Sequence, residues 1–192
     1  MKPLSLTLKN FGPYINETID FTKFEDSSLF LISGKTGSGK TTIFDGMSYA
    51  LFGESSGKLR LGKEMRSTFA DPSEATEVTL LFKHNEFLYE LNRLPEQELF
   101  KKRGTGVRKQ SAKISLIVKD AQGKELRAYS KRREVDELIQ ELLHLNANQF
   151  AQIVLLPQGE FRTFLIAKSD EKEKVLRNLF GTELYQLFSE NL

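Results

Sequence analysis

A glycine-rich segment at residues 34–42 constrains this chain more than any other part of its sequence. It contains Gly34, Gly39, Lys40 and Thr41 at the spacing G-x-x-x-x-G-K-[ST]. A continuous apolar run at residues 28–33 precedes it and predicts a strand buried on both faces, while the helical spacing that follows predicts a helix ending near Gly53. A strand, a glycine loop and a helix in this order predict a phosphate-binding loop.

The residue types of this loop suit a nucleotide and a divalent cation. Glycines let successive backbone N–H groups point into one concavity, and the following helix adds the partial positive charge of its N-terminus. Lys40 would place its charge on the β and γ phosphates of ATP, and the Thr41 hydroxyl would be a Mg²⁺ ligand. The candidate nucleotide-binding residues are Gly34, Thr36, Gly37, Ser38, Gly39, Lys40, Thr41 and Thr42.

Antiparallel hairpins are predicted before and after this loop. Leucines alternate with polar residues over residues 4–8, which predicts a half-buried strand, and a second strand is expected over residues 17–21. Two hairpins are predicted farther along, one pairing 78–82 with 87–91 and one pairing 114–119 with 124–129. The spacing of Val135, Leu138, Ile139, Leu142 and Leu143 predicts an amphipathic helix. The remaining expected elements are a strand at 153–156 and helices at 169–180 and 182–192.

Four blocks of the chain resemble the SbcC-type DNA-repair ATPases, relatives of the SMC proteins within the ABC ATPase class. The blocks are residues 8–14 with 19–21, residues 29–46, residues 50–53 and residues 153–161. The resemblance implies an α/β fold, with residues 1–181 as the N-terminal lobe of an ABC/SMC-type P-loop ATPase head that carries an antiparallel β-hairpin subdomain. Residues 182–192 would start a coiled-coil helix. Gln158 would be the Q-loop glutamine that reaches Mg²⁺ and the attacking water, and Lys40 and Gln158 would be the catalytic residues.

The same resemblance implies partners. Family members are ATPases whose heads dimerise with ATP and which act with an SbcD-type nuclease on DNA ends and hairpins. Their Walker B Asp-Glu pair and signature motif lie on a C-terminal half beyond a long coiled coil. This chain has no run of four apolar residues followed by Asp-Glu. We therefore expect it to be the N-terminal half of such an ATPase, inactive in hydrolysis until its C-terminal half is present.

Positive charge is concentrated between Arg93 and Arg133. This segment holds 13 basic and four acidic residues, although the formal net charge of the whole chain is only +2. Clustered Lys and Arg bind the backbone of double-stranded DNA with little regard to sequence. Because this segment has few aromatic residues, we expect backbone binding rather than stacking on the bases of single strands. The alternative is a solvated lobe whose lysines protect an edge strand from aggregation. We expect the strongest positive electrostatic field, and hence the DNA contacts, at Lys101, Lys102, Arg103, Arg108 and Lys109.

The composition limits the remaining classes of function. The 192-residue chain has no cysteine and two histidines, which excludes disulfides, thiolate zinc sites and a histidine metal cage. It has no signal peptide and no apolar run of about 18 residues, so we expect a cytoplasmic protein without a membrane partner. A stand-alone P-loop kinase is the alternative function, but no acceptor-activating carboxylate is recognisable and the basic segment would have no role.

Overall fold

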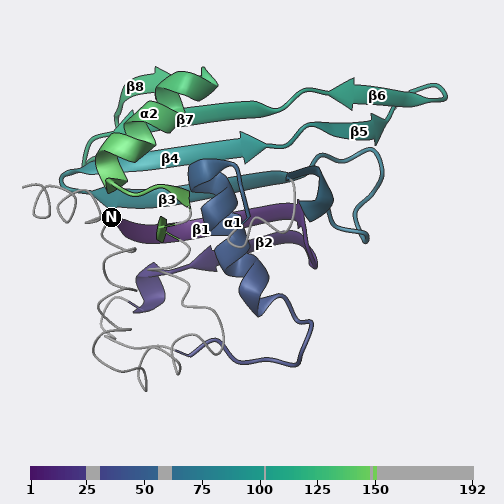
Figure 1. Ribbon diagram of the computed structural model, residues 1–192, viewed down its shortest axis with the longest axis horizontal. Helices are drawn as coiled ribbons and strands as arrows, with labels where there is room; N and C mark the ends of the chain where they lie inside the picture. The colour runs from purple at the N-terminus through teal and green to yellow at the C-terminus, as the bar shows by residue number, and fades with distance from the viewer. Residues whose placement is uncertain (25–30, 56–61, 102, 148, 151–192) are drawn as a thin grey trace, which may run out of the picture. The chain divides into compact units, whose positions relative to one another are not determined.

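The computed structural model describes residues 1–24, 31–55, 62–101, 103–147, 149 and 150. The chain divides into two compact units, Met1–His144 and Leu145–Leu192. All the helices and strands that follow belong to the first unit (Figure 1). The strand expected at 153–156, both helices expected beyond it and Gln158 lie outside the described residues.

A six-stranded antiparallel sheet forms the framework of the first unit. Its strands run in the order β2-β1-β3-β4-β7-β8. The bounds of these strands are β1 Lys2–Phe11, β2 Tyr14–Asp20, β3 Glu77–His84, β4 Phe87–Leu94, β7 Lys113–Lys119 and β8 Glu125–Tyr129. All the strands predicted around residues 4–21 and all those of the two later hairpins are confirmed. Within the β3–β4 hairpin the register follows from the tight turn at Asn85, which has a φ of 53°.

One face of this sheet holds the core. Alternate residues of β1 and β3 are buried, and Leu6 lies opposite Leu80 while Leu8 lies opposite Val78. Leu80 in turn pairs with Leu91 of β4, so the apolar positions continue from strand to strand. This period-2 pattern is the one expected of an antiparallel sheet with one buried face.

Two helices cover the sheet. α1 (Lys40–Phe52) contacts β1, β3 and β4, and α2 (Arg132–Leu143) contacts β7 and α1 (Figure 1). Helix α1 approaches β1 so closely at Gly46 that a Cβ there would lie 2.6 Å from Leu8 Cδ2. Gly53 ends α1 with a φ of 75°, which confirms the predicted terminating glycine. The predicted amphipathic helix is also confirmed. The described part of the unit also contains two short 3₁₀ helices, η1 (Thr22–Phe24) and η2 (Gly62–Met65).

A separate two-stranded hairpin, which was not predicted as strands, continues from β4 and returns to β7. It consists of β5 (Gln97–Phe100) and β6 (Val107–Gln110), paired so that Phe100 faces Val107. Figure 1 shows this hairpin extending beyond the end of the main sheet. The tip of the basic segment expected at residues 101–109 is therefore the end of this hairpin.

The buried strand predicted at residues 28–33 is not found in its described part. Residues 31–33 have no regular structure, and the side chain of Leu31 is 88% exposed. An apolar run becomes a buried strand only where a neighbouring strand pairs with its backbone and apolar side chains cover it. Among the described residues no strand pairs with this segment.

Candidate nucleotide site and basic hairpin

The glycine loop leads into α1 as predicted. Gly37 and Gly39 have φ values of 84° and 91°, a left-handed conformation that glycine adopts without the penalty a Cβ brings. Lys40 is the first residue of α1, and its side chain reaches back along the loop. Its Nζ donates hydrogen bonds of 2.8 Å to the carbonyl oxygens of both Gly34 and Lys35. The lysine therefore lies across the loop, with its charge at the helix N-terminus.

The turn between β1 and β2 contacts this loop, a contact that the sequence did not predict. Tyr14 Oη donates a hydrogen bond of 3.2 Å to the carbonyl oxygen of Gly39. A Cβ on Gly39 would lie 2.6 Å from Pro13 Cγ, and a Cβ on Gly12 would lie 2.5 Å from Thr42 Cγ2. Both glycines are thus required where the turn meets the start of α1. A glycine-proline turn is readable in the sequence, but the surface it packs against is not.

The donors at this helix start fit a polyphosphate. Gly39 is the N-cap and offers no side-chain acceptor, and the first turn of α1 holds no acidic residue. The first N–H groups of a helix have no partner within the helix, and they attract anions. A Cβ on Gly37 would meet nothing within 4 Å, so the loop is open on that side. The side chains of Thr36, Ser38 and Thr41 are exposed, and the Thr41 hydroxyl can be offered to a Mg²⁺ ion.

Arg93 is bound at the opposite end of α1 and does not belong to the exposed basic surface. Its Nε donates a 2.9 Å hydrogen bond to Ala50 O, and its Nη2 donates a 3.2 Å hydrogen bond to Leu51 O. The same Nη2 lies 2.9 Å from Asp136 Oδ1 of α2. With only 5% of its surface exposed, Arg93 joins β4, α1 and α2. This corrects the sequence interpretation, which counted Arg93 within the basic segment.

Several other cations of the segment are neutralised in the fold. Four of them form ion pairs with acidic residues that neighbour them on a helix or across a strand pair: Lys119 with Glu90, Lys131 with Glu134, Arg132 with Asp136, and Arg133 with Glu137. The net excess counted from the sequence therefore overstates the positive charge that is available to a ligand.

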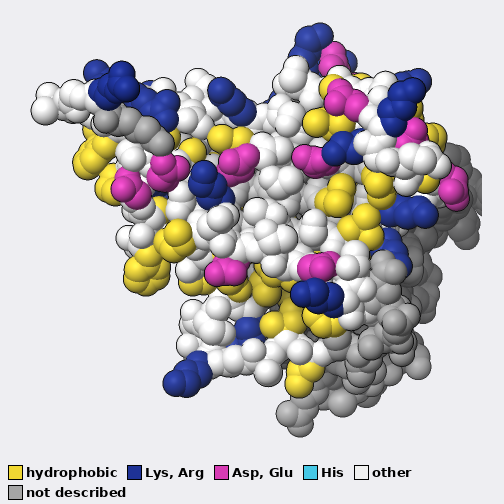
Figure 2. Space-filling model, turned by 180° about the vertical axis from the view of Figure 1, so that it is seen from behind, with side chains coloured by type: hydrophobic (Ala, Val, Ile, Leu, Met, Phe, Trp, Pro, Cys, Tyr) yellow, Lys and Arg dark blue, Asp and Glu magenta, His cyan; other side chains and the backbone are white. Residues whose placement is uncertain are grey.

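The basic hairpin, residues 96–110, retains most of its charge. Lys101, Arg103, Arg108 and Lys109 are exposed, and Figure 2 shows Lys and Arg side chains gathered at the far end of the hairpin. Only Lys109 among these four has an ion-pair partner within the described residues, Glu96 at 3.0 Å. Lys102, the fifth candidate, lies outside the described residues. The structure thus brings the other four predicted DNA-binding residues together on one loop and strand.

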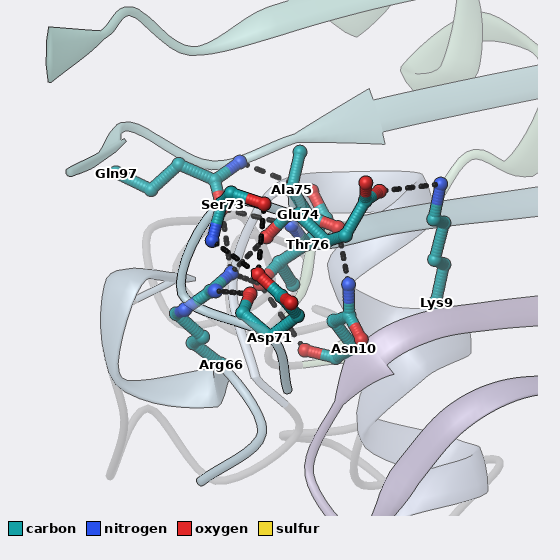
Figure 3. A network of polar contacts seen from close by, with 9 residues as sticks. All are labelled: Lys9, Asn10, Arg66, Asp71, Ser73, Glu74, Ala75, Thr76 and Gln97. Atoms are coloured by element: carbon teal, nitrogen blue, oxygen red, sulfur yellow. Dashed lines mark hydrogen bonds and ion pairs between the residues drawn. The ribbon is translucent and has the colours of Figure 1, made fainter. Parts of the chain in front are cut away.

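A polar network fastens the base of this hairpin to the end of β1 (Figure 3). Gln97 of β5 exchanges hydrogen bonds with the backbone of Thr76, accepting at 2.8 Å and donating at 3.2 Å. Thr76 Oγ1 donates to Asn10 O at 3.1 Å, and Arg66 donates to Gln97 Oε1 at 3.3 Å. Residues distant in sequence meet here, so sequence reasoning missed the network.

The described residues contain no group of three or more His, Asp or Glu side chains that could hold a metal ion. In the same part of the chain no helix combines the length and the apolar character needed to cross a membrane.

Comparison with known proteins places the chain among relatives of known name. It is 45% identical to the SbcC subunit of the nuclease SbcCD from Lactococcus lactis over the whole of this chain and 18% of the relative. The subunits of the same name from Vibrio cholerae and Staphylococcus aureus are 45% and 46% identical over 96% and 100% of this chain, again 18% of each relative. The chain therefore spans about 18% of the length of these curated relatives. These identities confirm the resemblance to the SbcC-type ATPases.

A solved structure from a study of ATP-driven dimerization and DNA-stimulated activation of SMC ATPases was also compared with this chain. The alignment covers 93% of this chain and 99% of that chain. The TM-score is 0.46 and the identity is 18%. The family model described as AAA domain matches residues 5–188. Because this match covers nearly the whole sequence, the chain belongs to the family of AAA domains.

Proposed function

We propose that this chain is the nucleotide-binding N-terminal part of an SbcC-like ATPase. The observation that carries the proposal is the loop at residues 34–42, where the Lys40 side chain and the open start of α1 lie together. The relatives named as SbcC subunits of the nuclease SbcCD support it. In this proposal the protein works in the cytoplasm with its C-terminal half, an SbcD-type nuclease and double-stranded DNA, and processes DNA ends and hairpins during repair and recombination.

The residues of this chain would bind and orient ATP. The N–H groups of the loop and the Lys40 ammonium would hold the β and γ phosphates, since a charged acceptor forms stronger hydrogen bonds than the carbonyl oxygens that Lys40 now contacts. Thr41 and Gln158 would bind Mg²⁺, which neutralises phosphate charge during transfer. Gln158 would also position the attacking water. The paired carboxylates and the opposing signature face would come from the C-terminal half in an ATP-dependent head dimer.

Replacing Lys40 with alanine tests nucleotide binding. We expect Lys40→Ala to weaken Mg-ATP binding by about 10- to 150-fold, because a hydrogen bond to a charged group contributes about 1.5–3 kcal/mol. Isothermal titration calorimetry gives the affinity, and circular dichroism shows whether the variant is folded. Lys35→Ala is the matched control, since it removes the same charge from the same loop but not the lysine of the motif. Equal affinity in all three proteins would refute the site.

Removing charge from the basic hairpin tests DNA binding. We expect the triple variant Lys101→Ala, Lys102→Ala, Arg103→Ala to weaken binding of a labelled duplex about equally for all sequences. Each lost phosphate contact reduces the slope of log affinity against log salt by about 0.9, so the slope should flatten by up to about three units. Fluorescence titrations at several salt concentrations, with the protein in its two-half form, measure both quantities. ATP binding should be unchanged.

The matched control removes three cations that are already paired. Lys131→Ala, Arg132→Ala, Arg133→Ala alters the net charge by the same amount, but each of these residues has an acidic partner on α2. We expect a much smaller change in the salt slope. If both triple variants change DNA binding equally, the effect is one of net charge, and if neither does, the hairpin is only a solvated surface.

A further inference from the structure

The basic hairpin carries an apolar platform on one of its faces. Along β5 the side chains of Gln97 and Leu99 are buried while those of Glu98 and Phe100 are exposed. Phe100 is 55% exposed, and its cross-strand partner Val107 is 49% exposed. Directly opposed residues of an antiparallel pair share one face, so the two side chains lie beside each other in water. Leu99 on the other face is fully buried, so the burial of β5 alternates strictly from one residue to the next.

Cations without described partners lie in the tip beside this platform. Lys101 follows Phe100 directly, and its N–H closes the tip by donating to Gly106 O at 3.1 Å. Arg103 lies in the same loop, whereas Arg108 pairs with Leu99 and therefore lies on the opposite face of the hairpin from Phe100. A Cβ on Gly104 or Gly106 would meet nothing within 4 Å, so the tip leaves open space around the platform. Positive charge and an exposed ring therefore lie together on one short projection.

A second exposed aromatic residue belongs to the adjoining loop. Phe100 N donates a 2.9 Å hydrogen bond to Pro72 O, which ties the hairpin to the loop at residues 66–76. Phe69 of that loop is 75% exposed. The sequence interpretation disfavoured stacking because few aromatic residues fall within the basic segment, but it could not show that a second one is carried on a neighbouring loop.

The exposed ring and the neighbouring cations together indicate which class of ligand this platform binds. A duplex backbone needs only the cations and gains nothing from an exposed ring. Unpaired nucleobases have exposed π faces that stack on aromatic side chains without regard to sequence, and their phosphates need nearby cations. We propose that Phe100, supported by Val107, stacks on unpaired bases at DNA ends or in hairpin loops while Lys101 and Arg103 of the hairpin tip hold the adjoining phosphates.

This inference rests on the DNA binding proposed above. It adds that the protein prefers DNA with unpaired bases over a plain duplex. Two probes separate stacking from charge. Both are the same short blunt duplex extended by a single-stranded tail, made of thymidines in one probe and of abasic sites in the other, so that the number of phosphates is equal. The protein in its two-half form should bind the thymidine tail more tightly than the abasic tail.

Phe100→Ala should remove that preference. We expect it to weaken binding of the thymidine-tailed probe by about 5- to 150-fold, the range that corresponds to the loss of one base–aromatic stack, and to leave the abasic-tailed and blunt duplexes within about two-fold. Phe100→Tyr should retain the preference. Phe87→Ala is the matched control, because Phe87 is an exposed aromatic residue of β4 at 41% exposure and lies outside the basic hairpin.

The outcomes distinguish this inference from the proposed function. If the parent protein binds no DNA, the proposed DNA function itself fails. If it binds all the probes equally and Phe100→Ala leaves these affinities unchanged, the hairpin contacts only the DNA backbone and the stacking proposal is overturned. It is also overturned if Phe100→Ala weakens every probe alike, or if DNA binding is unchanged while a nuclease partner dissociates, which would make the platform a protein contact.

Discussion

Single residues at the β1–β2 turn determine how the glycine loop is held. Tyr14 contributes a hydrogen bond to Gly39 O, and burial, with a smaller contribution from Glu17, raises the pKa of this tyrosine. Its hydroxyl therefore stays a donor at neutral and mildly alkaline pH. Pro13 fills the space that a side chain on Gly39 would need. The turn thus restricts the end of the loop directly before the lysine that we assign to the phosphates.

A prediction at this scale separates backbone strain from steric overlap. Gly39→Ala should lower the free energy of unfolding by about 3 kcal/mol, because it combines a left-handed backbone with a clash against a proline ring that cannot move aside. Gly37→Ala shares the positive φ but meets no atom within 4 Å, so it should cost only about 1 kcal/mol. Urea unfolding of both variants gives the two values. Equal losses would show that the turn does not restrict the loop.

Among the elements, the main connection is made by Arg93, which links β4 to both helices. The carbonyl oxygens at the end of α1 have no partners within that helix, and the guanidinium supplies donors to two of them while it pairs with Asp136. Tyr49, buried on the same helix end, has its pKa raised to about 12 by burial, partly offset by Arg93 and Arg132. It remains neutral beside these cations.

Replacing Arg93 tests this connection. Arg93→Met keeps a chain of similar length but leaves two buried carbonyl oxygens without their donor and removes the buried one of the two cations that pair with Asp136, so the free energy of unfolding should fall by about 3 kcal/mol. Arg132→Met is the matched control, since Arg132 lies 3.2 Å from the same carboxylate but its side chain is 75% exposed. Its loss should be below about 1 kcal/mol. Similar losses on urea unfolding would contradict the special role of the buried cation.

At the scale of the whole molecule, the nucleotide loop and the basic hairpin lie on one framework. The Gly12 N–H donates to Met65 O at 2.7 Å, and the neighbouring Arg66 reaches the base of the hairpin through Gln97. A contiguous set of contacts therefore runs from the turn that holds the loop to the strand that carries the cations. The ATP hydrolysis proposed above, by contrast, would require an Asp-Glu pair after an apolar run, and no motif in this sequence supplies it.

We accordingly expect ATP binding without appreciable turnover from this chain by itself. Gln158 would position a water molecule, but the sequence has no Asp-Glu pair after a run of four apolar residues to activate it, and removing such a general base typically costs about 10²–10⁴ in rate. Phosphate release from the chain alone, and again after addition of the C-terminal half, measures this. Turnover of the isolated chain equal to that of the reconstituted protein would contradict the proposal that the C-terminal half supplies part of the catalytic site. Phosphoryl transfer to small acceptors would instead support the kinase alternative.

Short-range patterns in the sequence were sufficient to predict the glycine loop, α1, α2 and most of the strands. Each depends on residues only a few positions apart, because alternation, helical spacing and the positive φ of glycine act locally. Only the tertiary structure decided which side chains are exposed. Leu31 is exposed where a buried strand was expected, Arg93 is buried where a surface cation was expected, and Phe100 is exposed at the hairpin tip. Exposure depends on partners that are distant in sequence, and no local pattern identifies them.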